Sequence, residues 1–247
     1  MMARLPYCGS PPLPGELLAR FNLDPILIAA LVLCAAWHLA RCRNPRQRRL
    51  AAAGWLVAFA AFVSPLCALS VALFSARIAQ HMILLLIAAP LLALALPRDS
   101  RRLARGPLWS SAAAFFIALW YWHMPGPYDA TFTSTFTYWC MHLSLFGTGI
   151  LLWREILHPP PARIVETFAV GAFTSMQMGF LGAILAFAGR PLFSWHLLTT
   201  YSWGLTPLQD QQLGGTLMWV PGVLLFLWAA IRSIDRLWNA LDGVKTA

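Results

Sequence analysis

The residues of this chain best suited to chemistry are histidines that stand beside sulfur-containing residues within apolar stretches. In chain order these groups are His81–Met82, His123–Met124 and Cys140–Met141–His142. Imidazole nitrogen together with thioether or thiolate sulfur is the ligand set that suits Cu(I). The pattern predicts a soft metal site in which the three histidines are ligands and the neighbouring sulfur atoms assist.

A second polar group precedes the last apolar stretch of the chain, where Asp210 and Gln211 come shortly before Gly214 and Gly215. A carboxylate in the first turn of a helix is favoured by the helix dipole by about 0.3–1 kcal/mol. Asp210 therefore either caps that helix or, with Gln211, orients one of the histidines from behind. Three further residues are expected near the site: His196, Met178 and Met218.

The composition indicates whether these residues lie in a soluble protein or in a membrane protein. The chain has 247 residues, of which 59% are hydrophobic and only 11% are charged, and its mean hydropathy is +0.64. Soluble domains carry about 25% charged residues. A soluble globular enzyme is therefore excluded, and the lipid bilayer is the expected surrounding.

Helices that cross a bilayer need about 20 mostly apolar residues, and seven stretches of the sequence qualify. They span residues 25–40, 50–73, 78–96, 108–122, 135–153, 164–188 and 213–231. Pro65 lies inside the second and predicts a kink, and Pro90 and Pro221 lie inside the third and seventh. Prolines in spans are tolerated where neighbouring helices satisfy the freed carbonyls. The fold class is thus an all-α polytopic membrane protein with seven transmembrane helices. Residues 1–24 form a tail outside the membrane, residues 25–232 the transmembrane domain, and residues 233–247 a C-terminal tail.

The distribution of positive charge predicts the orientation of these helices. Most of the 18 basic residues lie between the first and second, third and fourth, and fifth and sixth stretches, or after the seventh. Because cytoplasmic loops are rich in arginine and lysine, the N-terminus is expected outside and the C-terminus in the cytoplasm. The net charge of +9 comes from short arginine clusters rather than from one basic stripe, so nucleic acid is not an expected partner.

Several other activities lack the residues they need. The five cysteines are odd in number and widely spaced, which predicts neither a disulfide framework nor a zinc ribbon. The only lysine, Lys245, lies in the tail, so no retinal Schiff base can form within a span. Phosphate-binding loops, nucleophile elbows and H-E-x-x-H motifs are absent from the sequence. We therefore expect a protein that is not an enzyme.

Three runs carry a family resemblance that extends from Asn22 to about Ile231. They are FSARIAQHM at 74–82, WHMP at 122–125, and DQQLGG at 210–215 followed by Met218 and Trp219. Together they resemble the multi-pass CtaG-type cytochrome c oxidase assembly factors. Many members of that family carry a histidine four residues before the one at His81, where this chain has Arg77.

The resemblance implies a multi-pass protein of the bacterial plasma (inner) membrane that helps to mature a haem–copper oxidase. In that role His81, His123, His142 and Asp210 match recurrent polar positions of the family. The chain would hold Cu(I) transiently near the outer face, receive it from a periplasmic carrier, and pass it to an oxidase subunit. Affinity for copper should fall below about pH 6, as imidazoles become protonated.

Two alternatives remain open at this point. Histidines on facing helices can also ligate haem, so the chain could be a haem- or quinone-binding subunit of a respiratory complex. It could instead be a purely structural partner that docks onto an oxidase. In the first case the purified protein would show a Soret band, and in the second the histidines would be dispensable.

Overall fold

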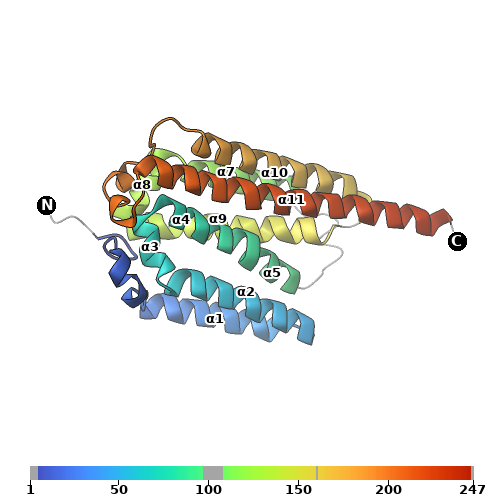
Figure 1. Cartoon of the computed structure of the whole chain (residues 1–247). Helices are drawn as coiled ribbons and strands as arrows, with labels where there is room; N and C mark the ends of the chain where they lie inside the picture. The colour runs from blue at the N-terminus through green and yellow to red at the C-terminus, as the bar shows by residue number, and fades with distance from the viewer. Residues whose placement is uncertain (1–4, 97–107, 160, 246–247) are drawn as a thin grey trace.

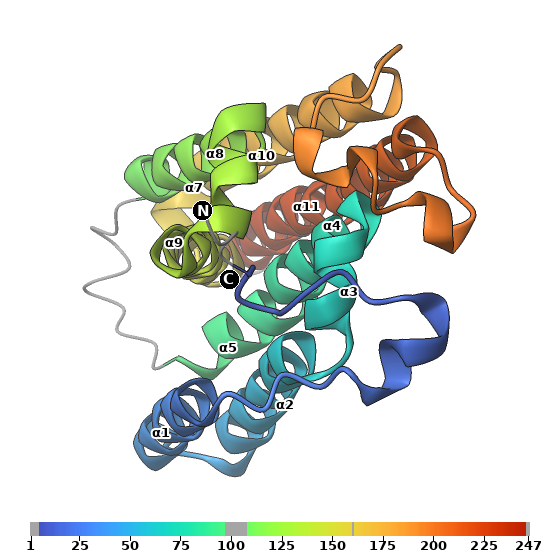
Figure 2. The same cartoon turned by 90° about the vertical axis from the view of Figure 1, so that its left-hand side faces the viewer.

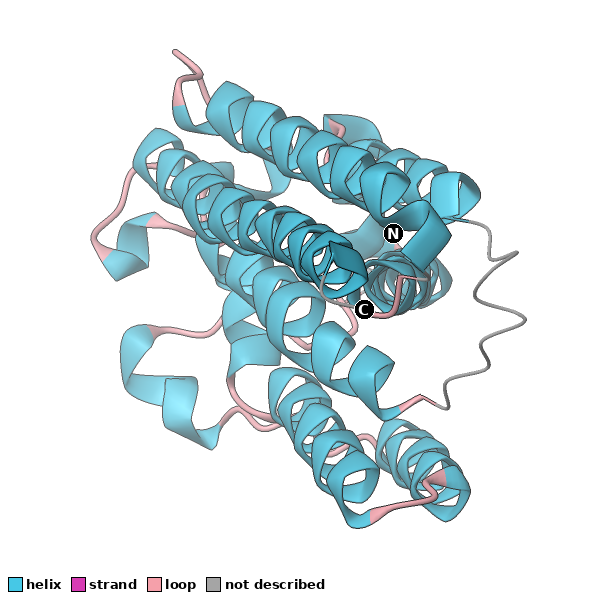
Figure 3. Ribbon diagram, turned by 90° about the vertical axis from the view of Figure 1, so that its right-hand side faces the viewer, coloured by secondary structure: helices cyan, strands magenta, loops and turns pink. Residues whose placement is uncertain are grey.

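The computed structural model describes residues 5–96, 108–159 and 161–245, with side chains described for all of these except residues 161 and 233–245. Within these ranges every regular element is a helix (Figure 3). The α-helices are α1 (Pro25–Arg41), α2 (Pro45–Val63), α3 (Leu66–Ala72), α4 (Phe74–Ile83), α5 (Ala89–Ala95), α7 (Leu108–Trp122), α8 (Pro125–Thr133), α9 (Thr135–Leu157), α10 (Ile164–Ala186) and α11 (Pro207–Lys245). A π-helical segment, Leu84–Ala88, joins α4 to α5, and 3₁₀ turns occur at Pro14–Ala19, Pro161–Arg163, Ser194–Leu197 and Tyr201–Trp203.

Each of the seven apolar stretches is helical, but their ends and continuity differ from the prediction. The second is broken at Ser64 and Pro65 into α2 and α3, which are bent by 48°. The last begins six residues earlier than expected, at Pro207, and continues without a break to Lys245. The expected boundary at residue 233 is therefore not a helix end. The arginine-rich segment between α5 and α7, like Arg4, lies outside the described residues.

Length and composition identify candidate membrane spans among these helices. In the described part of the chain three helical segments are long and apolar enough, namely Phe74–Ala95, Ile164–Ala186 and Pro207–Arg232, and the bent pair α2–α3 makes a fourth. The helices α1 and α7 are apolar but shorter. Several long apolar helices indicate a multi-pass membrane protein, while the count of seven spans stays a prediction.

The break after α2 is repaired by a side chain from another helix. Pro65 has no N–H, so it cannot satisfy the carbonyl of Ala61 one turn earlier. Gln80 on α4 donates its Nε2–H to that carbonyl at 2.7 Å. Gln80 is fully buried. A bend that would otherwise leave an unpaired polar group in an apolar core is thereby stabilised.

The proline inside α5 is accommodated in a similar way. In the π-helical segment before it, the carbonyl of Leu85 would bond to the N–H of residue 90, which is a proline. Trp153 on α9 donates its indole N–H to the Leu85 carbonyl at 2.7 Å. The kink expected at Pro65 is thus confirmed, and the helix is π-helical before Pro90. At both places a side chain that is distant in the sequence satisfies a freed carbonyl. Pro221 lies inside the unbroken α11.

Two helices approach each other closely through glycines. A side-chain carbon placed at Gly215 on α11 would lie 2.4 Å from the backbone nitrogen of Ala186 and 2.7 Å from the carbonyl oxygen of Gly182 on α10. No real side chain fits at such distances. Small residues therefore let α10 and α11 pack backbone to backbone, as in other membrane helix pairs.

The connections of the bundle divide between its two ends. Figure 1 shows the N-terminal segment, α3, α8 and the connection between α10 and α11 at one end, on the left, which we call the capped end. Viewed from that side in Figure 2, the N-terminal segment runs across the bundle. The α1–α2 connection lies at the opposite end, and α11 extends beyond it (Figure 1). Five arginines cluster around this connection, on it and on the adjoining helix ends: Arg41, Arg43, Arg46, Arg48 and Arg49.

The capped end contains a disulfide bond, contrary to expectation. Cys8 in the N-terminal segment is bonded to Cys67 at the start of α3, 59 residues away in the sequence. Cysteine spacing could not reveal the pair, because the packing of the N-terminal segment on the start of α3, and not a local motif, brings the two cysteines together. Cys34, Cys42 and Cys140 are free.

Candidate metal site

The three histidines singled out in the sequence lie together in the structure. His81 on α4 is central, since its ring centroid lies 5.8 Å from that of His123 and 5.2 Å from that of His142. His123 directly follows α7, and His142 lies two turns into α9. All three side chains are at most 4% exposed. Three different helices therefore bring imidazoles into one buried cluster, which we call the histidine cluster.

The backbone fixes the protonated nitrogen in two of these rings. Nδ1 of His123 donates to the carbonyl of Leu119 at 2.6 Å, and Nδ1 of His142 donates to the carbonyl of Tyr138 at 3.1 Å. Because a carbonyl only accepts, Nδ1 carries the hydrogen and Nε2 presents a lone pair. A histidine that binds a metal has its other ring nitrogen held in this way.

The remaining ring nitrogens of the cluster are unsatisfied. Within the described part of the chain, Nε2 of His123, Nε2 of His142 and both nitrogens of His81 are buried without a hydrogen-bond partner. Buried polar atoms without partners are rare, and each one costs about 1–3 kcal/mol. Several unpartnered nitrogens on three adjoining rings are expected where the rings act as ligands for a metal ion.

The spacing of the rings is close to that of a three-histidine metal site, although the site is not formed. With a metal–nitrogen distance of about 2.0–2.1 Å, rings in tetrahedral arrangement have centroids about 5 Å apart. No three His, Cys, Asp or Glu side chains in the described ranges already stand in metal-binding geometry. Side-chain rotation would therefore have to complete the coordination.

The neighbouring sulfur atoms are not equally placed. Met82 and Met141 are buried in the main hydrophobic core, whereas the Met124 side chain is 50% exposed at the start of α8, and Cys140 is partly buried. Adjacent residues on a helix point about 100° apart, so Met82 and Met141 do not share the direction of the histidines next to them. The assistance of the histidines by neighbouring sulfur atoms stays a prediction.

The two methionines expected from α10 and α11 occupy packing positions. Met178 and Met218 are both fully buried. The side chain of Met178 fills the space that a side chain at Gly222 would need, with its sulfur 2.8 Å from the position of that absent carbon. A structural role in joining α10 to α11 accounts for Met178.

Asp210 caps a helix, but not the helix on which it lies. Its carboxylate accepts hydrogen bonds from the backbone N–H of Phe74 at 2.6 Å and of Ser75 at 3.1 Å, and from the Ser75 hydroxyl at 2.5 Å. These groups form the first turn of α4. Gln211 likewise bonds to backbone, accepting from Leu192 N–H and donating to the Leu185 carbonyl. Both residues act on the scaffold, and the contacts that orient the histidines come from backbone carbonyls instead.

His196 is buried near the cluster but belongs to a separate set of contacts. Its Nε2 accepts from the Tyr128 hydroxyl at 2.8 Å, and its Nδ1 donates to the carbonyl of Ala72 at 3.3 Å. With both ring nitrogens satisfied, His196 ties the α10–α11 connection to α3 and α8. Burial, with the nearby charge of Arg77, lowers the pKa of His196 to about 3.

Arg77 and Tyr138 were not predicted as part of the site, yet they form its outer wall. The Arg77 side chain is 1% exposed, with its guanidinium 4.5 Å from the ring centroid of Phe132 and 5.4 Å from that of Tyr138. The Tyr138 ring lies 4.3 Å from the His142 ring. The i, i+4 spacing of Tyr138 and His142 on one helix was the available signal for this contact.

An apolar cavity of about 320 Å³ opens beside the cluster. It is bounded by α1, α2 and α9, and its lining includes Leu27, Phe62 and His142, with Tyr7 and Asp24 near its capped end. His142, a member of the histidine cluster, therefore borders a cavity that lies outside the packed core.

These features describe a multi-pass helical membrane protein with a buried, incompletely satisfied histidine cluster near its capped end. The family model of the cytochrome c oxidase caa3 assembly factor matches residues 30–239. The chain therefore belongs to the caa3-type cytochrome c oxidase assembly factor family. No curated protein and no solved structure matches it.

Proposed function

We propose that this chain holds Cu(I) transiently at the histidine cluster during maturation of a haem–copper oxidase, and that it does so without catalysing a reaction. The family name connects the chain with caa3-type cytochrome c oxidase, and an assembly factor implies a non-catalytic role. The copper step is supported by the donor set: neutral imidazoles with bare Nε2 atoms, in an apolar surrounding, suit Cu(I).

A single observation carries the proposal. His81 contacts both His123 and His142, and four ring nitrogens of this group are buried without partners. A purely structural cluster would be expected to satisfy them with neighbouring carbonyls or hydroxyls. Because the ligands still have to rotate to meet one metal ion, binding would be labile, as release to an oxidase subunit requires.

The orientation proposed for this function places the capped end outside the bacterial plasma membrane. Disulfides such as Cys8–Cys67 form and persist in oxidising compartments like the periplasm. The arginines that cluster on and beside the α1–α2 connection lie at the opposite end, as expected on the cytoplasmic side. A periplasmic copper carrier would then deliver to the capped end, and the oxidase subunits would receive copper there.

The haem alternative is not favoured by the geometry. Two axial histidines must face each other across a porphyrin, which needs a flat space between the rings. Here the His81 ring meets both neighbours edge to face, at interplanar angles of 80° and 72°. That packing leaves no slot for a macrocycle between them.

The direct test replaces His81, His123 and His142 together by glutamine, in a host strain whose own copy of the assembly factor is deleted. We expect the oxidase in those membranes to lose copper and activity while its polypeptides are still made. The matched control is His38→Gln, since His38 is also buried in a helix but lies at the opposite end, where its Nδ1 accepts from the Trp55 indole N–H.

Normal oxidase copper in the triple variant would refute the copper role and favour a purely structural partner. A second outcome would refute the orientation: labelling of cysteines introduced into the α1–α2 connection by a membrane-impermeant reagent from the periplasmic side. In that case the cluster would open toward the wrong compartment.

A further inference from the structure

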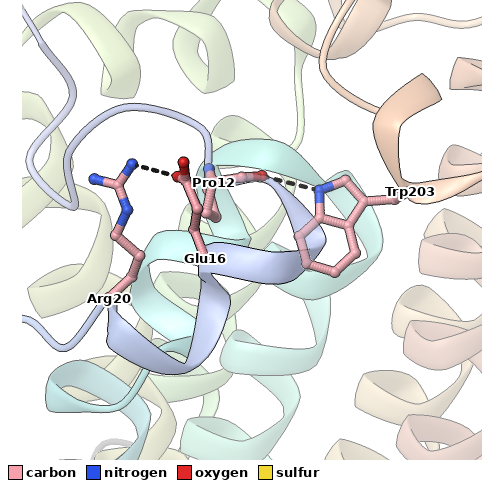
Figure 4. A network of polar contacts seen from close by, with 4 residues as sticks. All are labelled: Pro12, Glu16, Arg20 and Trp203. Atoms are coloured by element: carbon pink, nitrogen blue, oxygen red, sulfur yellow. Dashed lines mark hydrogen bonds and ion pairs between the residues drawn. The ribbon is translucent and has the colours of Figure 1, made fainter.

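The N-terminal segment is firmly attached across the capped end. The Tyr7 hydroxyl donates to Asp24 at 2.5 Å, and the Tyr7 ring packs 4.8 Å from that of Tyr138. Figure 4 shows a second attachment, in which the Trp203 indole donates to the carbonyl of Pro12 at 3.2 Å beside the Glu16–Arg20 ion pair. The Tyr7 hydrogen bond lowers the pKa of Asp24, which keeps the acceptor charged.

The disulfide within this attachment lies directly above the histidine cluster. The Tyr138 hydroxyl is 3.5 Å from Sγ of Cys8 and 3.8 Å from Sγ of Cys67. The same tyrosine accepts the Nδ1 hydrogen bond of His142 through its backbone carbonyl. One residue therefore separates the two sulfur atoms from a candidate copper ligand.

The two sulfur atoms differ in accessibility and in surroundings. Cys8 is partly exposed, whereas Cys67 is fully buried. Beside Cys67, the Asn22 amide donates to Sγ at 3.5 Å, and the Tyr138 hydroxyl is a second available donor. An attacking thiolate can reach Cys8, and the departing Cys67 thiolate would be stabilised where it forms.

Arg77 supplies a positive charge without a matching negative one. Its Nη1 is buried without a partner, and its Nε donates only to the Ser70 carbonyl at 3.4 Å. Ser70 in turn donates its hydroxyl to the Cys67 carbonyl at 2.8 Å. In the described part of the chain no carboxylate lies within ion-pair distance of Arg77. A buried cation of this kind is costly unless an anion joins it.

We infer that Cys8 and Cys67, when reduced, form a second Cu(I) site, a bis-thiolate complex whose single negative charge is balanced by Arg77. Two thiolates are strong ligands for Cu(I), and their complex with one Cu(I) carries a charge of −1. The inference rests on the proposed copper function for the identity of the metal. It adds a site within the capped end, where the Tyr138 hydroxyl lies beside both sulfur atoms and the Tyr138 carbonyl accepts the hydrogen bond of His142.

The redox step requires a dithiol protein of the thioredoxin class as reductant. One thiolate of the reductant attacks Sγ of Cys8, which breaks the Cys8–Cys67 bond and releases the Cys67 thiolate. The second thiol of the reductant then attacks the mixed disulfide, which frees Cys8 and leaves the reductant oxidised to a disulfide. Cu(I) next displaces one proton from each remaining thiol and forms two copper–sulfur bonds.

The test compares Cu(I) bound to the purified full-length protein before and after treatment with a phosphine reductant, with a Cu(I) chelator as competitor. We expect copper–sulfur scattering in X-ray absorption and one additional bound Cu(I) only after reduction. Both should be lost in Cys8→Ser, which leaves the fully buried Cys67 in place. The double variant Cys34→Ser/Cys42→Ser should retain both, because these free thiols lie outside the pair and outside the histidine cluster.

Equal copper–sulfur scattering before and after reduction would overturn the inference, as would its persistence in Cys8→Ser. The triple histidine variant separates this inference from the proposed function. If the thiol site exists, reduction of that variant still yields the copper–sulfur signal, whether or not the histidines matter for oxidase maturation. Loss of the signal there would show that the thiols do not form a site of their own.

Discussion

Asp210 and Ser75 are joined by two hydrogen bonds, although 135 residues separate them in the sequence: the Ser75 N–H donates at 3.1 Å and its hydroxyl at 2.5 Å to the same carboxylate oxygen. The bond from the Phe74 N–H completes a cap on α4 provided by α11. Since His81 lies on α4, this cap sets the position of the central residue of the histidine cluster.

Replacement of Asp210 by alanine should therefore destabilise the protein and weaken copper binding together. Two buried N–H groups and a hydroxyl would lose their acceptor, at a cost of about 2–4 kcal/mol. We expect a lower thermal unfolding midpoint in detergent and reduced Cu(I) affinity. Asp210→Asn preserves the shape of the side chain and one acceptor oxygen, so its unfolding midpoint and Cu(I) affinity should fall less than those of Asp210→Ala. An unchanged midpoint in Asp210→Ala would mean that α4 needs no cap from α11.

The close approach of α10 and α11 leads to a second prediction. Gly215→Ala places a carbon against the backbone of Ala186 and Gly182, so the helices must separate, at a cost of about 1–3 kcal/mol. Thermal unfolding measures the loss. The control is Gly147→Ala on α9, where a side-chain carbon meets no atom within 4 Å and removal of a helical glycine should be neutral or stabilising by up to about 1 kcal/mol.

A third prediction concerns acid stability and His196. Its pKa is lowered from 6.5 to about 3 in the folded protein, by burial and by the charge of Arg77. The unfolded chain therefore binds more protons below pH 6.5, so the stabilising contribution is complete above that pH and is lost as the pH falls toward 3. In His196→Gln the unfolding midpoint should decline less steeply between pH 7 and pH 4.

The control for this pH dependence is Tyr128→Phe, which removes the hydroxyl that donates to His196 but keeps the titrating ring. It should lower the midpoint at every pH and retain the slope. A slope unchanged in His196→Gln would show that other groups account for the acid sensitivity.

The sequence was sufficient for the helices because their signal is local. The stretch 108–122 coincides with α7, and α1 and α10 begin where predicted, at Pro25 and Ile164, because an apolar run is bounded there by charged or helix-breaking residues. Pro65 and Pro90 also marked where helices are interrupted or distorted. The co-location of His81, His123 and His142 was predicted from their similar depth in three consecutive apolar stretches.

The remaining features depend on partners that are distant in the sequence. Nothing near Asp210 indicates that its carboxylate reaches α4 rather than its own helix, and nothing near Cys8 points to Cys67. Nothing near Arg77 in the sequence indicates that its guanidinium lies against the rings of Phe132 and Tyr138. These contacts join segments that are far apart in the sequence, and they form only when the helices pack together at the capped end.

The charge of Arg77 leads to a prediction with opposite signs at the two proposed sites. It repels a cation bound by neutral imidazoles but attracts an anionic copper bis-thiolate. Between unit charges on the order of 10 Å apart, at an effective dielectric constant of about 20, such an interaction is worth about 1–2 kcal/mol, roughly tenfold in affinity. Arg77→Gln should therefore bind Cu(I) more tightly than the parent protein when oxidised, and less tightly when reduced.

Arg77→Lys retains the charge, so its affinities should equal those of the parent protein in both states. Chelator competition measures the affinity of all three proteins in both states. A shift of the same sign in both states for Arg77→Gln would show that the guanidinium acts through packing rather than through its charge.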